Sequence, residues 1–284
     1  MAYDGDIQWF PGHMTKTRRM IEADLKLVDA VAEIVDCRIP ESSRNPLINE
    51  IISGKPRIIL LNKCDQADEK VTAEWQRFYR EKGIKTIVCD CRSGKGLNKF
   101  LPLLKEELSE LLEKRRAKGT VGKALRIMVV GIPNVGKSSF INRMAGSRKT
   151  KVEDRPGVTR GKQWVSVSRE AELLDMPGVL WPKFDDKQAA LKLAFTGAVK
   201  DDVTDIESLA AELGAYLAEN YPDRLKERYK LDSLEGNILE TIAKKRGMML
   251  AGGVPDTGRA AAALLDEYRG GKIGRISLER PSSS

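Results

Sequence analysis

The stretch GIPNVGKSS, residues 131–139, constrains the fold of this chain more than any other part of the sequence. It follows the apolar run LRIMVV and precedes FINRMAG, which has the pattern of a helix. The spacing matches GxxxxGK[ST], a loop that needs a strand before it and a helix after it, because its backbone amides surround phosphate oxygens at the positive end of that helix. The sequence therefore predicts a phosphate-binding loop in an α/β fold.

The residues of this loop divide by role. Lys137 is expected to reach the β- and γ-phosphates of a bound nucleotide, and Ser138 to offer its hydroxyl to Mg²⁺. Glycines let the neighbouring backbone amides point inward around the phosphates. The other residues of this loop that we expect to contact the nucleotide are Asn134, Val135, Gly136 and Ser139.

Two segments farther along the chain fit the same site. Thr159 in RPGVTRG supplies a second hydroxyl for Mg²⁺. In LLDMPG, Asp175 ends a strand and is placed for the metal, while Gly178 offers its amide to the γ-phosphate. A lone aspartate at a strand end is usually a turn residue, but the order of these segments after a phosphate loop favours the metal-binding role.

The sequence NKCD, residues 62–65, is suited to binding guanine. The Asp65 carboxylate can accept the N1 and N2 hydrogens of guanine, a pair that adenine does not present. Asn62 can bond the base edge and the neighbouring loop, the stem of Lys63 can lie along the purine ring, and Cys64 belongs to the same loop. Together with the phosphate loop, this segment predicts that the chain binds GTP and GDP.

The hydrophobic pattern divides the chain into two parts. Up to about residue 200, short aliphatic runs alternate with helical patterns, which predicts a mostly parallel sheet covered on both faces. The short link between QWVSVS and AELLD suits a hairpin. Beyond residue 200, only helical periodicity remains. We therefore expect an all-helical domain over residues 201–284, with Asp256 capping a late helix. The tail, residues 269–284, is rich in glycine and serine and is expected to be mobile.

The guanine-binding segment precedes the phosphate loop, which is the reverse of their order in a Ras-like domain. Because the ends of compact domains often lie close together, joining them and cutting elsewhere preserves the fold. We therefore predict an α/β fold: a circularly permuted Ras-like P-loop GTPase domain with a six-stranded, mostly parallel sheet, followed by an all-helical C-terminal domain. The expected GTPase domain, residues 1–200, comprises a guanine-specificity half at 15–113, a basic join at 114–123, and a phosphate-loop and switch half at 124–200.

Charge points to a polyanionic partner. The net charge is +8, and residues 114–169 hold fifteen lysines and arginines against two acidic residues. One nucleotide needs only one or two lysines, so the surplus favours RNA, although a solvated basic face explains it equally well. The sequence shows neither a signal-type N-terminus nor an apolar run of membrane-span length, so we expect a cytoplasmic protein that binds neither membrane nor DNA.

Taken together, the chain resembles the circularly permuted GTPases of the RbgA/YlqF group and their mitochondrial relatives. The stretches that carry the resemblance cover nearly the whole length: WFPGHM, DCRIPESSRNP, NKCD, GIPNVGKSS, PGVTRG, DMPG and GGVPDTGRAA. The resemblance implies an assembly factor for late maturation of the large ribosomal subunit. Such a factor binds ribosomal RNA of the subunit precursor in its GTP state and is released after hydrolysis stimulated by the ribosome.

The resemblance also implies finer roles. Asn134 would help coordinate K⁺ beside the phosphates. Asp90 and Cys91, in DCRSGKG, would contact the base, in a loop that in this family usually has a serine followed by a small residue. Here those positions are Cys91 and Arg92, and because the loop acts through backbone amides, we expect guanine binding to persist.

Catalysis lacks the usual residue. Ras-like enzymes orient the attacking water with a glutamine just after DxxG, but Val179 stands there and has no group to hold a water. His13, the chain's one histidine, can accept a hydrogen bond from water near neutral pH. From the sequence alone, a structural or RNA-contacting role for His13 is the stronger interpretation, whereas the resemblance favours catalysis after the ribosome repositions the segment.

Two other functions stay open. The chain could be a GTP-regulated switch for a non-ribosomal protein partner, with its basic surface incidental. An ATP-driven enzyme rests on the phosphate loop alone. Salt-sensitive binding of ribosomal RNA favours the ribosomal role, and a stable RNA-free complex favours the switch for a protein partner.

Overall fold

The computed structural model describes residues 14–52, 54–120, 122–146, 163–178, 180, 186–199 and 205–282. The strands of this part are β1 (Ala30–Asp36), β2 (Arg57–Asn62), β3 (Lys85–Val88), β4 (Leu125–Val130), β5 (Gln163–Ser168) and β6 (Ala171–Asp175). The helices around the strands are α1 (Met14–Leu25), α2 (Pro46–Ile51), α3 (Glu69–Glu81), η2 (Leu97–Lys99), α4 (Phe100–Glu107), α5 (Ser109–Ala117), α6 (Lys137–Ala145) and α7 (Lys187–Phe195). Four further helices follow: α8 (Ile206–Asn220), α9 (Pro222–Tyr229), α10 (Ile238–Lys245) and α11 (Thr257–Arg269).

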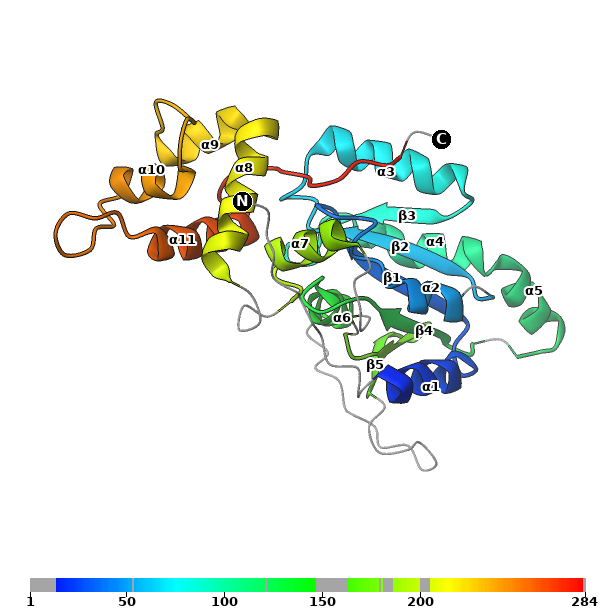
Figure 1. Cartoon of the computed structure of the whole chain (residues 1–284). Coiled ribbons are helices and arrows are strands. Elements are labelled where there is room, and N and C mark those ends of the chain that lie inside the picture. The colour runs from blue at the N-terminus through cyan, green and yellow to red at the C-terminus, as the bar shows by residue number, and fades with distance from the viewer. Residues whose placement is uncertain are drawn as a thin grey trace.

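The strands form one six-stranded sheet in the order β3-β2-β1-β4-β6-β5. Every neighbouring pair is parallel except β5 and β6, which form an antiparallel hairpin. This confirms the predicted mostly parallel sheet and its single hairpin. The strand β4, which leads into the phosphate loop, pairs with β1 in the centre of the sheet, so the two halves of the sequence meet there (Figure 1).

Helices cover both faces of the sheet, and side chains alternate between the faces along each strand. On one face, Val31 and Val35 of β1 pack with residues of α1, α2 and α3. On the other face, Ile34 belongs to a larger cluster with α4 and α6, where the rings of Phe100 and Phe140 meet edge to face with centroids 5.1 Å apart. Because the central strands are buried on both faces, they are mostly apolar in the sequence, with few charged residues such as Glu33 and Arg126.

The helices α8 to α11 pack on one another beyond α7 (Figure 1). As expected, Asp256 caps α11 by accepting a hydrogen bond from the amide of Arg259. One apolar cluster continues from the sheet through α7 into these helices, and the division at residue 200 stays a prediction. In the described part of the chain, no helix is long and apolar enough to cross a membrane.

The expectation of a mobile tail is wrong for residues 270–282. Ile276 and Leu278 are buried, and their amides donate to the carbonyl oxygens of Gln66 and Arg38 at 2.9 and 2.8 Å. The segment returns from α11 to the sheet and lies beside α3 (Figure 1). Local composition suggested flexibility, but the apolar side chains of the tail find partners that are distant in sequence.

Candidate nucleotide-binding site

The phosphate loop connects β4 to α6 and needs glycine at two positions. Gly131 has φ 152°, and a Cβ there would lie 2.6 Å from the carbonyl oxygen of Ile34. Gly136 has φ 102°, and its Cβ would lie 2.3 Å from Asn62 Nδ2. Side chains are therefore excluded for both conformational and steric reasons. The loop delivers Ser138 to the exposed first turn of α6, as the motif predicts.

Lys137 is buried at the start of α6. Its Nζ donates to the carbonyl oxygens of Gly131 and Ile132 at 3.0 and 2.7 Å. Burial lowers the pKa of Lys137 to about 8, although the Asp175 carboxylate opposes this shift. Burial likewise raises the pKa of Asp175, and Lys137 opposes that shift. A further negative charge nearby, such as that of a phosphate, would therefore stabilise the charged form of Lys137.

The DMPG segment approaches the same lysine. Asp175 ends β6, opposite Val129 of β4 in the parallel register. A Cβ on Gly178 would lie 2.8 Å from Lys137 Nζ and 3.0 Å from the backbone nitrogen of Pro133. Glycine thus lets the backbone after β6 come against the phosphate loop, next to the lysine expected to hold the terminal phosphates.

Asn134 connects the phosphate loop to the segment after α7. Its backbone adopts φ 60°, a left-handed conformation that asparagine tolerates better than most residues. Its Nδ2 donates to the carbonyl oxygen of Gly197 at 2.6 Å. This orientation uses the nitrogen of the amide and leaves the carbonyl oxygen as the group that could face a cation.

Asn62 joins the guanine-binding segment to two other loops. Its Nδ2 donates to the carbonyl oxygen of Val135 at 2.6 Å, and its Oδ1 accepts from the amide of Cys91 at 2.9 Å. The side chain is buried, so both bonds satisfy groups that water does not reach. One residue therefore fixes the phosphate loop, the NKCD loop and the DCRSGKG loop relative to one another.

A buried ion cluster supports this loop. The Asp36 carboxylate accepts from Arg38 Nε and NH2 at 2.9 and 2.7 Å, and it lies 2.9 Å from Lys63 Nζ. Burial alone would raise the pKa of Asp36, but Arg38 and Lys63 hold it below its usual range. Sequence reasoning had used DCRIPESSRNP only as a mark of resemblance and missed this cluster. An Asp and an Arg two residues apart at the end of a buried strand were the available signal.

The remaining base-contacting candidates differ in exposure. Asp65 is exposed, as a group that binds a ligand must be, whereas Cys64 is buried. Asp90 is buried, and its oxygens accept from the amides of Arg92 and Ser93 at 2.8 and 3.1 Å. Burial would raise the pKa of Asp90, but hydrogen bonds from the Ser93 side chain and from the amides of Arg92 and Ser93 hold it below its usual range. The Asp90 side chain therefore shapes the loop, and a direct contact with the base stays a prediction.

A hollow of about 590 Å³ lies between this loop and α6. Two residues that were selected from separate motifs, Cys91 and Ser139, line it together. Its full lining is Cys91, Arg92, Ser139, Asn142, Arg143 and Gly146. The structure thus brings the base loop and the phosphate helix to one concave surface.

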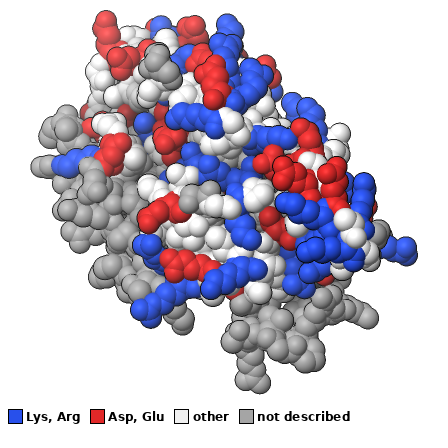
Figure 2. Space-filling model, turned by 90° about the vertical axis from the view of Figure 1, so that its right-hand side faces the viewer, with Lys and Arg blue, Asp and Glu red and all other residues white. Residues whose placement is uncertain are grey.

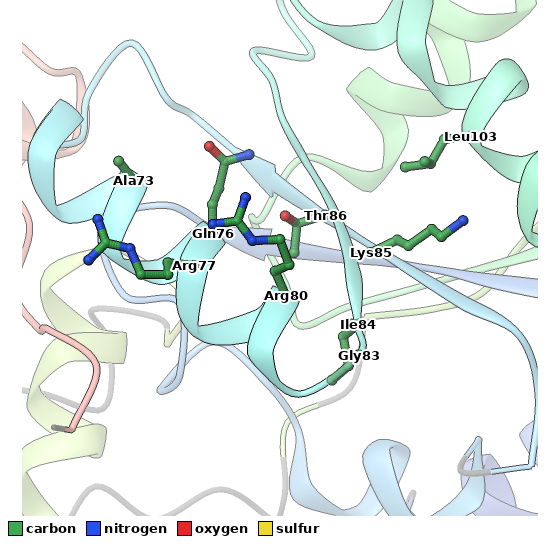
Figure 3. A pocket seen from close by; sticks show the side chains of 9 residues that line it. All are labelled: Ala73, Gln76, Arg77, Arg80, Gly83, Ile84, Lys85, Thr86 and Leu103. Carbon is green, nitrogen blue, oxygen red and sulfur yellow. The ribbon is translucent and has the colours of Figure 1, made fainter. Parts of the chain in front are cut away.

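A second hollow, of about 680 Å³, lies at the edge strand β3. Figure 3 shows Gln76 and Arg80 of α3 and Thr86 and Lys85 of β3 among the side chains that line it. At its rim, Lys85 is paired with Glu106 at 2.7 Å. No residue with an expected nucleotide role lines this hollow, so we do not include it in the site.

Several basic residues of the helical part have partners within the protein. Arg246 pairs with Glu267 at 2.6 Å, and Lys245 with Asp232 at 2.6 Å. Arg269 donates to the carbonyl oxygen of Ala194 at 2.8 Å. On the face that includes α5, lysines and arginines are interspersed with acidic side chains (Figure 2). These contacts favour a structural role for the three residues.

Two residues of the expected site, His13 and Thr159, lie outside the described residues, as does Val179. The fold and the rest of the site nevertheless define a class. A phosphate loop that follows a central strand and is hydrogen-bonded by Asn62 to the NKCD loop, which precedes it in sequence, is the arrangement of a circularly permuted P-loop GTPase.

Comparison with known proteins assigns the family. Residues 126–230 match the model of the 50S ribosome-binding GTPase family. Ribosome biogenesis GTPase A of Priestia megaterium is 48% identical over 98% of this chain and 98% of its own length. The structure of GNP-bound YlqF from T. maritima has a TM-score of 0.65 and 29% identity over 95% of this chain and all of that one, and GDP-bound YlqF has the same TM-score. The chain belongs to the ribosome biogenesis GTPase A family, and it is a GTPase.

The lowered pKa of Lys137 predicts a pH dependence of nucleotide binding. Phosphates bind the charged lysine, so above its pKa of about 8 binding must be accompanied by uptake of a proton. We expect the Kd for GDP to be nearly constant below pH 7 and to rise roughly tenfold between pH 7 and pH 9. Titration with a fluorescent GDP analogue measures this, and a Kd that is flat across that range would contradict the assignment of Lys137.

Proposed function

We propose that this GTPase is an assembly factor for late maturation of the large ribosomal subunit. It binds the subunit precursor through ribosomal RNA in its GTP state and leaves after hydrolysis that the particle stimulates. The observation that carries the nucleotide part is the side chain of Asn62, which holds the phosphate and guanine loops together. The name of its 48% identical relative supports the ribosomal part, and we propose a cytoplasmic location.

The site residues have the chemistry that Mg²⁺ requires. Hydroxyl and carboxylate oxygens are its preferred protein ligands, usually alongside waters and substrate phosphates. Ser138 lies on the exposed first turn of α6, and Asp175 ends the strand next to β4. We assign Ser138, Asp175 and Thr159 to Mg²⁺, which would neutralise charge on the β- and γ-phosphates. Asn134, whose amide nitrogen already bonds Gly197, would use its oxygen for K⁺.

The base and phosphate contacts follow from the same geometry. The exposed Asp65 carboxylate reads guanine, and the Lys63 stem lies along the purine while its ammonium stays on Asp36. The loop that includes Cys91, held by the bond from the Cys91 amide to Asn62, supports the base. Gly178, beside Lys137, donates its amide to the γ-phosphate. The helical part, residues 201–284, would add contacts with RNA or ribosomal protein.

Binding to the particle can be tested directly. We expect the protein to cosediment with purified large subunits or their precursors with a non-hydrolysable GTP analogue, and more weakly with GDP. Because contacts with RNA phosphates release counterions, binding should weaken steeply as KCl is raised. Binding that ignores both nucleotide and salt, or a stable RNA-free complex with another protein, would favour a switch for a non-ribosomal partner.

His13→Ala is expected to abolish most of the particle-stimulated hydrolysis while GTP affinity is unchanged. Loss of a residue that orients or activates the attacking water costs roughly 10²- to 10³-fold in rate. His13→Gln is the matched control, because a glutamine amide can also orient water and should restore part of the rate. A normal stimulated rate in His13→Ala would refute the role of His13.

A further inference from the structure

The tail of the chain holds the loop that carries Asp65. The amide of Ile276 donates to the carbonyl oxygen of Gln66 at 2.9 Å. The amide of Asp68 donates to Ser277 Oγ at 3.2 Å. These two bonds lie one and three residues beyond Asp65, whose own side chain is exposed. The direction of the Asp65 carboxylate therefore depends on a backbone that the tail fixes on its C-terminal side.

The tail is itself attached to the sheet. The amide of Leu278 donates to the carbonyl oxygen of Arg38. The guanidinium of Arg38 and the ammonium of Lys63 both contact the Asp36 carboxylate. The Glu279 carboxylate accepts from the amide and hydroxyl of Ser42 at 3.0 and 2.7 Å. The stretch DCRIPESSRNP, which the nucleotide motifs did not explain, is thus the surface on which the tail lies.

The helical part holds the tail from the other side. The hydroxyls of Tyr216 and Tyr221 each donate to the carbonyl oxygen of Ser277 at 3.0 Å. Burial raises the pKa of Tyr216 to about 12, so its hydroxyl keeps its proton at physiological pH. The ring of Tyr268 in α11 lies 5.1 Å from the guanidinium of Arg38. A continuous set of contacts therefore runs from α8 through Ser277 to the guanine-binding loop.

We propose that Ser277 is a positioning residue of the guanine-binding loop, through which the helical part sets the selectivity for guanine. The inference rests on the proposed base-reading role of Asp65 and goes beyond it. Held at Gln66 and Asp68, the loop presents Asp65 to the N1 and N2 hydrogens of the base without a further loss of entropy on binding. By linkage, a guanine nucleotide must stabilise the docked tail by the same factor by which the docked tail strengthens binding of that nucleotide.

The test compares GDP with IDP, whose hypoxanthine base lacks the N2 amino group. In the full-length chain, Ser277→Ala should raise the Kd for GDP about 3- to 10-fold, a range that corresponds to one hydrogen bond, and raise the Kd for IDP less. The preference for GDP over IDP therefore falls. Ser277→Thr, which retains the hydroxyl, should restore it. Ser233→Ala is the matched control, because Ser233 Oγ accepts from the amide of Glu235, distant from the base loop.

The possible outcomes distinguish the role of Ser277 from the base-reading role of Asp65. If Ser277→Ala keeps the wild-type preference for GDP over IDP, the proposed role of Ser277 is wrong, whether or not the variant is less stable to heat. The base-reading role of Asp65 is not affected by that result. If Ser277→Ala does not fold, Tyr221→Phe removes only a hydroxyl that holds the tail, and an unchanged GDP preference there overturns the inference equally. A wild-type protein that binds GDP and IDP alike refutes the base-reading role of Asp65, and this inference with it.

Discussion

Asp65→Asn is expected to change the base preference of the nucleotide site from guanine to xanthine. The aspartate carboxylate accepts two hydrogens from guanine, whereas the asparagine amide would direct its own hydrogens at the N2 amino group. Xanthine carries an oxygen at that position and pairs with the amide. Because the mismatch leaves buried polar groups unpaired, GDP affinity should fall on the order of 10³-fold, and XDP affinity should rise.

Competition of GDP and XDP against a fluorescent nucleotide measures this change. Asp232→Asn is a suitable control, since Asp232 is an exposed aspartate that pairs with Lys245 in the helical part. It should keep the wild-type preference. If Asp65→Asn also kept the wild-type preference for GDP over XDP, the guanine-reading role of Asp65 would be wrong.

Lys137→Met is expected to reduce GTP hydrolysis at least ~10³-fold, because the charge that faces the β- and γ-phosphates in the transition state is lost. Without nucleotide, the same variant should be no less stable than wild type. Burial lowers the pKa of Lys137 to about 8, so the folded protein disfavours the charged form that predominates at pH 7. Methionine removes that cost, and the free energy of unfolding should rise by ~1 to 3 kcal/mol.

Single-turnover hydrolysis and thermal unfolding of the nucleotide-free protein together test this prediction. The stability difference should disappear above the pKa of an unfolded lysine, where the wild-type residue is neutral in both states. Lys105→Met, at an exposed lysine that pairs with Glu170, should change neither quantity. A Lys137→Met protein that hydrolyses GTP normally would contradict the assignment of the phosphate loop.

Much of the fold follows from local sequence patterns. The aliphatic runs in β1, β2 and β4 predicted buried parallel strands, and the link between β5 and β6 predicted the antiparallel hairpin. The order of the motifs predicted the permutation, because each motif requires a particular strand end and the sheet has few ways to bring these ends together. These features are local, and the pairing of β1 with β4 follows once the two halves of the domain are recognised.

Most of the contacts that the sequence did not reveal join residues that are distant in the chain. The tail has the composition of a flexible segment, but Ile276 and Leu278 are buried against residues more than 200 positions earlier in the chain. Asp36 and Arg38 form a pair whose importance depends on Lys63. No periodicity or motif spacing encodes such partners, since tertiary packing decides which charged groups become buried together.

The permuted chain order explains how the C-terminal tail comes to contact the guanine-binding loop. In this chain order, β6 is followed in the described part of the chain by the helices α7 to α11 and by no further strand of the sheet. The chain then has to cross from α11 to reach the guanine-binding loop again, and residues 273–280 make that crossing. Both sides of the nucleotide site therefore contact the region beyond β6, the phosphate loop through Asn134 and Gly197, and the base loop through Gln66 and Ile276.

We propose that the large ribosomal subunit controls the rate of GTP hydrolysis by this GTPase. Single-turnover GTP hydrolysis at physiological K⁺, with and without purified large subunits, tests it most directly. We predict a slow rate for the protein alone, since Val179 offers no group to orient water, and a rate roughly 100-fold higher or more with the subunits. An unchanged rate, measured while GTP remains tightly bound, would contradict the claim and point to control by a different partner.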